Sequence, residues 1–230
     1  MPDLTESLTM SGGSLVILLF GLVFKFSGFA VRDELLLRVL VVMGFICDAA
    51  YYFFRPEPIL PSVLSNIALL SVNIVLIAAI LLERTTWRMS SADREVFVLF
   101  PTLTPGQFRR LRKMMTTEQA EPGRVLTEEG KGVDELMLAF TSEITVEKAG
   151  EKFPIAGPAF VGEIAFLTGE TSSATVTLPH GGTVLRVESV ALKRRMVRNP
   201  GFNNAMVALF GRELARKVAY SVPMERAAAP

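Results

Sequence analysis

The residues best suited to chemistry lie in the stretch FVGEIAFLTGETSSATVTL at positions 160–178. Gly162 permits close approach of the backbone to a ligand, and a short helix beginning near Ile164 would direct backbone N–H groups at an anion. Glu163 can accept hydrogen bonds from a ligand hydroxyl, while Ser172 and Ser173 offer hydroxyl and backbone N–H donors to an anion such as a phosphate. Together these residues could hold the hydroxyl and phosphate groups of one ligand.

A strand-rich domain must position these residues. Between Glu118 and Glu188, short runs of alternating apolar and polar residues are separated by turn sequences. These turns read EPGR, EEGKG, KAGEK, AGP, TGETSS and PHGG. Regular turns at such close spacing predict a small antiparallel barrel or jelly roll.

A helix is predicted before this β-roll. The sequence TPGQFRRLRKMM gives Thr104 as N-cap, Pro105 at the first helical position and Gln107 at the capping-box position. Basic residues occupy the faces that its apolar residues leave, and we expect these faces to be solvated or close to a membrane. They are Arg109, Arg110, Arg112 and Lys113.

Two helices are predicted after the β-roll. KRRMVRN leads to Asn199 as a cap and to Pro200 at the start of the last helix. An apolar run follows at helical spacing, which we interpret as core packing or, alternatively, as a docking or dimerisation face. It consists of Phe202, Met206, Leu209, Leu214 and Val218.

This order of elements, with residues 160–178, resembles the cyclic-nucleotide-binding domain and its phosphate-binding cassette. EEGKGVDELMLAFTSEITV is similar to that family's glycine turn and strand pair, so the resemblance spans about Phe97 to Ser221. The phrase LFPTLTPGQFRRL, preceded by three apolar helices, is more similar still to the Popeye-domain proteins, which bind cyclic AMP. The resemblance implies cyclic AMP or cyclic GMP as ligand, with Glu163 on the ribose. The implied ligand-binding residues are Gly162, Glu163, Ile164, Ala165, Ser172, Ser173, Ala174 and Thr175.

The cassette departs from the cyclic-nucleotide-binding pattern at one position. Ser172 stands where an arginine pairs with the phosphate, and no Lys or Arg occurs between Phe153 and Leu185. Losing such a charge-assisted contact could cost on the order of 2 kcal/mol, or about thirtyfold in affinity. Popeye-domain proteins also lack this arginine, and their Asp-Ser-Pro-Glu and Phe-Gln-Val-Thr motifs are matched here only at Glu163, Val176 and Thr177.

A cation from elsewhere in the chain could compensate for the missing arginine. The candidates are Arg124 and Lys131 in adjacent turns and Arg212 in the last helix. The sequence does not choose among them. If none compensates, Gly162 and Glu163 are turn residues of a β-roll that no longer binds its ligand.

The first third of the chain is hydrophobic enough to cross a membrane. Three segments approach the roughly 20 apolar residues that a bilayer-spanning helix needs, and short links make neighbouring helices antiparallel. These segments are 14–31, 35–54 and 62–82, joined by VRDE and RPEPILP. A cleaved signal peptide is the alternative for the first segment, although Asp3 and Glu6 precede it instead of basic residues.

Basic residues set the predicted orientation. Lys25, Arg32 and Arg38 gather around the first link, and further arginines follow the third helix from Arg84 onward. The first link and the domain after Leu82 are therefore expected to be cytoplasmic and the N-terminus outside. Lys25 and Arg38 are expected to snorkel towards the interface.

Polar residues within these segments suggest internal contacts. Asp48 lies inside the second segment, and Asn66 and Asn73 share a face of the third. They indicate either hydrogen bonds between helices or an ion or proton path, and the small number of helices favours hydrogen bonding.

Composition argues against several other functions. A net charge of +1 with no basic stripe argues against nucleic acid as a partner, and Cys47, as the only cysteine, rules out an intramolecular disulfide or a cysteine metal cluster. His180, the only histidine, lies in the predicted turn PHGG without a nucleophile-elbow sequence. We therefore expect no catalytic residues, no metal and no cofactor.

The predicted class is α+β: a three-helix transmembrane segment followed by a cyclic-nucleotide-binding-like jelly roll with flanking helices. Its parts are 1–83, a linker 84–96, the domain 97–222 and a flexible tail 223–230. The expected function is that of a multi-pass cell-membrane regulatory protein that senses a cyclic nucleotide, with cyclic AMP as the first candidate, and has no catalytic activity. It is expected to act as a homodimer with an unidentified membrane or cytoplasmic protein. The alternative is a membrane scaffold whose domain no longer binds nucleotide.

Overall fold

The computed structural model describes residues 12–55, 57–87 and 89–221. The chain forms two compact units that divide between Thr85 and Thr86. The predicted flexible tail, 223–230, and the residues ahead of Gly12 lie outside the described residues.

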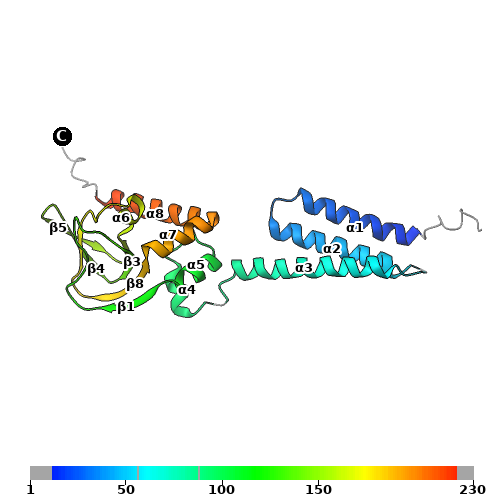
Figure 1. The fold of residues 1–230 in the computed structure, drawn as a ribbon, viewed down its shortest axis with the longest axis horizontal. Coiled ribbons are helices and arrows are strands. Elements are labelled where there is room, and N and C mark those ends of the chain that lie inside the picture. The colour runs from blue at the N-terminus through cyan, green and yellow to red at the C-terminus, as the bar shows by residue number, and fades with distance from the viewer. Residues whose placement is uncertain (1–11, 56, 88, 222–230) are drawn as a thin grey trace, which may run out of the picture. The chain divides into compact units, whose positions relative to one another are not determined.

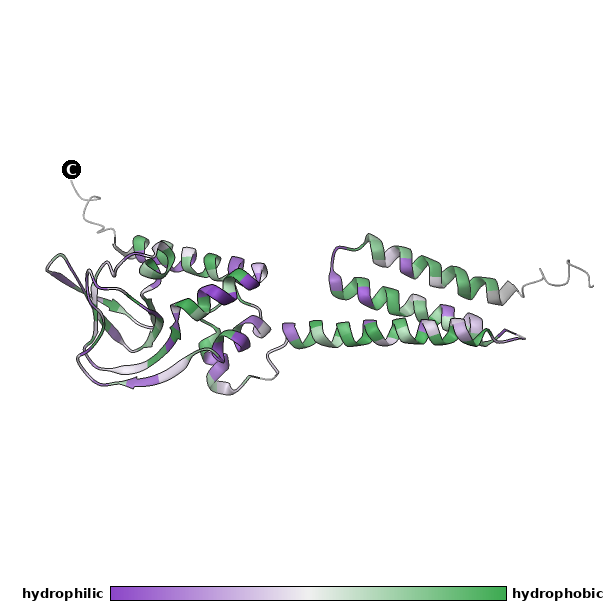
Figure 2. Cartoon of the chain, viewed as in Figure 1, coloured by the Kyte–Doolittle hydropathy of each residue, from purple (hydrophilic) through white to green (hydrophobic). Residues whose placement is uncertain are grey.

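The N-terminal unit consists of three helices joined by short links (Figure 1). They are α1 (Gly12–Ala30), α2 (Glu34–Phe53) and α3 (Leu60–Arg84). Figure 2 shows mainly hydrophobic colouring along all three. In the described residues, α2 and α3 are long and apolar enough to span a membrane, whereas the apolar stretch of α1, Leu15–Ala30, is shorter.

Small residues bring α1 and α2 close together. A Cβ on Gly44 would lie 3.0 Å from the Gly21 carbonyl oxygen, and one on Gly21 would lie 3.0 Å from the Cys47 Cβ. Such positions let two backbones approach closely, as in membrane helix pairs.

Polar side chains link these helices, as the preferred interpretation of the sequence predicted. Lys25 Nζ lies 2.5 Å from Asp48 Oδ2, so the expectation that Lys25 snorkels was wrong: a buried carboxylate holds it. Arg38 donates to Asn73 Oδ1 at 3.4 Å, joining α2 to α3. The amides of Asn66 and Asn73 donate to the carbonyls four residues earlier in α3, which satisfies them within their own helix.

The C-terminal unit begins earlier than predicted, with two short helices. Ser90 caps α4 (Ser91–Phe97), which lies largely inside the segment predicted as a linker. The predicted capping box of α5 (Pro105–Arg112) is confirmed, because Gln107 N–H donates to Thr104 Oγ1 and Thr104 N–H donates to Gln107 Oε1.

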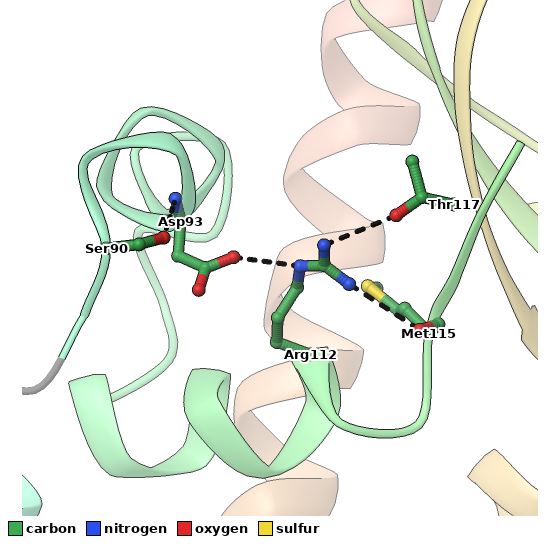
Figure 3. A network of polar contacts seen from close by, with 5 residues as sticks. All are labelled: Ser90, Asp93, Arg112, Met115 and Thr117. Carbon is green, nitrogen blue, oxygen red and sulfur yellow. Dashed lines mark hydrogen bonds and ion pairs between the residues drawn. The ribbon is translucent and has the colours of Figure 1, made fainter. Parts of the chain in front are cut away.

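Arg112 fastens these helices to the first strand (Figure 3). Its Nε lies 2.9 Å from Asp93 Oδ1 in α4, and its Nη2 lies 3.3 Å from Thr117 Oγ1 in β1. Its side chain is therefore part of a folded network and not of the solvated basic face that the sequence suggested.

Two four-stranded antiparallel sheets follow, as predicted for a jelly roll. One sheet has the order β1-β8-β3-β6 and the other β2-β7-β4-β5. The first contains β1 (Thr116–Ala120), β8 (Gly182–Glu188), β3 (Glu135–Phe140) and β6 (Ala159–Val161). The second contains β2 (Arg124–Thr127), β7 (Thr175–Leu178), β4 (Glu143–Lys148) and β5 (Glu151–Ala156).

Strand β3 is buried on both faces and separates two cores. Met137 and Ala139 pack between the sheets, whereas Leu136 and Leu138 pack in the second core, together with residues of the helices. This alternation follows from the period of two in a strand. The helices of this core are α4, α5, α6 (Glu163–Thr168), α7 (Ser189–Arg198) and α8 (Pro200–Ser221).

The last helix begins where the sequence predicted. Phe202 N–H donates to Asn199 Oδ1 at 2.9 Å, and Phe202 is buried. The apolar run of α8 is core at Phe202, Met206 and Leu209, but Val218 is 61% exposed and Phe210 is buried in addition. The core face of α8 therefore ends before Val218, and it also includes Phe210, which the predicted apolar run did not contain.

Candidate ligand-binding site

The segment 162–175, called the cassette below, crosses from one sheet to the other. It leaves β6 in the first sheet, forms α6 and enters β7 in the second sheet. All eight predicted ligand-binding residues lie on it, four at the turn after β6 and four where it enters β7. The two groups are therefore carried by different sheets.

Gly162 makes the turn after β6 possible. Its φ is +86°, in the left-handed region. A Cβ there would lie 3.0 Å from Val133 Cγ1 and 3.1 Å from the Glu135 carbonyl oxygen. Glycine is thus required both by the backbone conformation and by the close approach of the β2–β3 loop.

Glu163 is buried and already paired. Its side chain is 4% exposed, and its Oε1 lies 2.6 Å from the Nζ of Lys217 in α8. The same ammonium donates to the Phe160 carbonyl oxygen at 2.8 Å. One lysine thus satisfies a carboxylate that burial would otherwise make costly.

The neighbours of Glu163 divide between core and surface. Ala165 is buried, whereas Ile164 is 39% exposed. Phe166 packs against Phe210 of α8 with ring centroids 5.5 Å apart. The cassette therefore contacts the last helix through an aromatic pair as well as through the ion pair.

Ser172 is buried, and its polar groups bond within the protein. Its hydroxyl donates to the Ala174 carbonyl at 2.8 Å, and its N–H donates to the Lys131 carbonyl at 2.8 Å. Its own carbonyl accepts from the Gly130 N–H. Of the donors predicted for a phosphate, the Ser172 N–H thus holds the cassette to the β2–β3 loop, and the Ser172 hydroxyl bonds within the cassette.

The other residues of this group extend the same attachment. Thr127 Oγ1 donates to the Ala174 carbonyl at 3.2 Å, and Glu129 N–H donates to Thr175 Oγ1 at 3.0 Å. Ser173 is exposed. The β2–β3 loop therefore contacts both groups of cassette residues, Gly162 at one end and Ser172 to Thr175 at the other.

The three cations predicted as substitutes for the missing arginine have side chains that pair with other residues or are exposed, although the Lys131 backbone bonds to Ser172. Arg124 lies 3.8 Å from Glu118, Lys131 pairs with Glu128 three residues earlier, and Arg212 is exposed on α8. The basic residue bonded to Glu163 is Lys217, which the sequence analysis missed. Its signal is its spacing: Lys217 follows the buried Phe210 by seven residues and so lies on the core face of α8.

A cavity of about 800 Å³ opens beside the cassette, along β2 and the β2–β3 loop. None of the eight predicted residues lines it, although Val133, which contacts Gly162, does. Arg186 lies in it with Nη1 2.7 Å from Glu118 and Nε 3.2 Å from Glu135. Its charged groups are thus paired within the protein, as Glu163 is in the cassette.

The sequence matches no protein-family model and no curated protein sequence. Among solved structures, a protein from Geobacter metallireducens GS-15 assigned as cyclic nucleotide-binding is similar over 56% of this chain and 99% of its own, with 15% identity and a TM-score of 0.50. A cyclic nucleotide-binding domain from Methylobacillus flagellatus KT is similar over 58% of this chain and 83% of its own, with 19% identity and a TM-score of 0.50. The chain therefore contains the fold of a cyclic-nucleotide-binding domain.

Proposed function

We propose that this chain is a membrane-anchored, non-catalytic regulatory protein that senses a cyclic nucleotide, with cyclic AMP as the first candidate. The fold that it shares with cyclic nucleotide-binding proteins supports this function. The observation that carries it is the position of Glu163, a buried carboxylate on the turn where the chain crosses between sheets, bonded to the last helix.

This geometry couples a ligand to α8. We propose that a ribose hydroxyl donates to Glu163 Oε1, the oxygen that the Lys217 ammonium occupies, and so displaces the lysine. Binding would therefore loosen the contact between α8 and the cassette. A ligand that binds one arrangement of α8 better than another shifts the population between them, which is the basis of a sensor.

The membrane anchor is proposed from the helices of the N-terminal unit. The lengths and composition of α2 and α3 support two crossings, and we propose α1 as a third. Arg84, at the end of α3, lies 3.4 Å from Asp33 in the first link, so these positions share one end of the unit. The basic residues around that end support a cytoplasmic location for it, with the N-terminus outside.

The finer assignments remain predictions from the sequence. They are the likeness to Popeye-domain proteins, the choice between cyclic AMP and cyclic GMP, the homodimer and the unidentified protein partner.

A second function, that of a membrane scaffold without a ligand, is favoured by Ser172. Its hydroxyl and N–H bond to Ala174 and Lys131, which leaves these donors engaged within the fold. A β-roll whose donors are engaged in this way can bind a protein partner without binding a nucleotide.

Calorimetric titration of the full-length chain in neutral nanodiscs with cyclic AMP and cyclic GMP separates the two functions. The sensor predicts saturable binding that Glu163→Gln weakens at least tenfold and that Glu170→Gln leaves unchanged, since Glu170 is exposed in the same segment. Absence of binding heat for both nucleotides at millimolar concentration would reject the sensor and favour the scaffold. Equal affinity in both variants would show that the nucleotide binds elsewhere.

A further inference from the structure

Basic residues of the C-terminal unit are concentrated in two stretches without acidic residues. Residues 96–117 and 189–212 contain nine of the 24 Lys and Arg residues of the chain and no Asp or Glu. The net charge of +1 therefore hides a strongly uneven distribution. A surface that gathers one sign of charge attracts partners of the opposite sign.

These stretches meet where α5 and α7 lie together. Met114, just beyond α5, lines one hollow of about 270 Å³ with Arg194, Arg195 and Arg198 of α7. Figure 2 shows hydrophilic colouring on both helices. The exposed basic residues of α5, its C-terminal turn and α7 are called the basic surface below. They are Arg110, Lys113, Lys193, Arg194 and Arg198.

Other arginines of these helices have structural roles. Arg112 bonds to Asp93 and Thr117 (Figure 3), and the Arg195 guanidinium lies over the Phe202 ring at 5.6 Å. The Arg112 and Arg195 side chains are therefore not counted in the basic surface.

Apolar side chains lie among the exposed charges. Val190 and Val197, seven residues apart in α7, are 58% and 84% exposed. They share a face because seven residues make two helical turns. An exposed helix face that combines basic and apolar side chains is typical of helices that lie on a membrane surface.

The chain itself limits how far this surface can lie from a bilayer. Only the six residues from Thr85 to Ser90 separate α3 from α4. Six extended residues span at most about 20 Å. If α3 crosses a membrane, the basic surface belongs to a domain held beside the lipid headgroups, where nearby anionic lipids attract Lys and Arg.

We propose that the basic surface binds the anionic phospholipid headgroups of the membrane in which the chain is anchored. The phosphate and carboxylate groups of the lipids would pair with the basic residues of α5 and α7, and Val190 and Val197 would enter the headgroup layer. This inference rests on the membrane anchor of the proposed function and does not depend on nucleotide binding.

Fluorescence quenching in the full-length chain tests this surface. Cys47→Ser with Val197→Cys leaves one thiol for an environment-sensitive dye. The protein is placed in nanodiscs of phosphatidylcholine, with or without phosphatidylserine, containing a headgroup spin-labelled lipid as quencher. We expect quenching to be at least about threefold stronger with phosphatidylserine and to fall in high salt, since one basic residue changes surface affinity about fivefold. A dye at Lys152→Cys on β5 should show no such dependence.

Charge reversal provides a matched comparison. Arg194→Glu with Arg198→Glu should reduce quenching to the level in neutral nanodiscs. Lys148→Glu with Lys152→Glu, the same change of charge at two exposed residues of the β4–β5 hairpin, should leave it unchanged. Equal quenching of the unreversed protein in neutral and anionic nanodiscs overturns the proposal without relying on any charge variant.

Two further outcomes separate the alternatives. Saturable, salt-sensitive binding of a mixed-sequence oligonucleotide, with no response to phosphatidylserine, would identify a nucleic-acid surface and overturn the proposal. A chain that fails to enter neutral nanodiscs contradicts the membrane anchor instead. Co-flotation with vesicles that contain phosphatidylserine, but not with neutral ones, would then support the surface alone, and flotation with neither would reject it.

Discussion

Lys217 and Glu163 lie 54 residues apart in the sequence, yet their ammonium and carboxylate are 2.6 Å apart. The pair joins the C-terminal half of α8 to the turn that follows β6. Because the carboxylate is almost fully buried, its partner determines whether a ligand can use it.

Lys217→Met should therefore raise the affinity for a cyclic nucleotide. In the unaltered chain the ligand must displace a charge-assisted hydrogen bond, and removing that competitor should improve binding by about tenfold. Calorimetry in neutral nanodiscs measures the change. Lys193→Met, at an exposed lysine whose Nζ lies over the Phe166 ring, is the matched control. Unchanged or weaker binding in Lys217→Met would contradict competition for Glu163.

Gly162→Ala should destabilise the C-terminal unit more than Gly169→Ala does. Both glycines have positive φ, at +86° and +77°, so both substitutions incur a backbone cost of about 1–2 kcal/mol. Only at Gly162 would the new Cβ also crowd Val133 and the Glu135 carbonyl, since nothing lies within 4 Å at Gly169. Thermal unfolding of the two variants, compared side by side, isolates this contact. Equal losses of stability would mean that the β2–β3 loop moves aside without an energetic cost.

The pair of Lys25 and Asp48 should show strong coupling in the N-terminal unit. Removing either partner alone, by Lys25→Met or Asp48→Leu, leaves a largely buried charge and should cost about 3 kcal/mol. The double variant should recover most of this loss. The alkylation rate of Cys47, which lies against Gly21 of α1, reports opening of the two helices. Additive losses in the double variant would argue against the pair.

Asp33 should titrate at lower pH than an ordinary aspartate. The Leu36 N–H and the Arg84 guanidinium hold the pKa of Asp33 below its usual 3.8 by stabilising the carboxylate. Its contribution to stability is therefore present above pH 3.8 and is lost as the pH falls through the lowered pKa. In carboxyl NMR titrations, Arg84→Met should move the pKa upward but leave it below 3.8, because the Leu36 bond remains. No movement would exclude a contribution from Arg84.

Local sequence patterns predicted much of this architecture. Thr104 and Gln107 formed the expected capping box, Asn199 capped the last helix, and the turn KAGEK joined the antiparallel strands β4 and β5. These features depend on residues close together in the chain. Caps and alternation can therefore be recognised before the fold is known.

Contacts between distant elements could not be predicted in the same way. Helical spacing places Lys217 on the face of Phe210 but does not reveal that Glu163 lies opposite. From the sequence, Ser172 was a reasonable phosphate donor. In the structure its N–H and carbonyl bond to the β2–β3 loop. Such partners depend on how sheets and helices are brought together, which a single sequence does not specify.

Helix α8 is fixed at two buried aromatic residues and, farther along, by Lys217, so its C-terminal end can move when the lysine is released. Phe202 and Phe210 are buried along the helix, while Lys217 lies about 10 Å beyond Phe210 at 1.5 Å per residue. Release of Lys217 from both Glu163 and the Phe160 carbonyl oxygen would free the end of the helix, while the aromatic residues remain packed. A change of bonding at one lysine would then move the C-terminal end of α8. The distance from Phe210 to Lys217 would set how far that end moves.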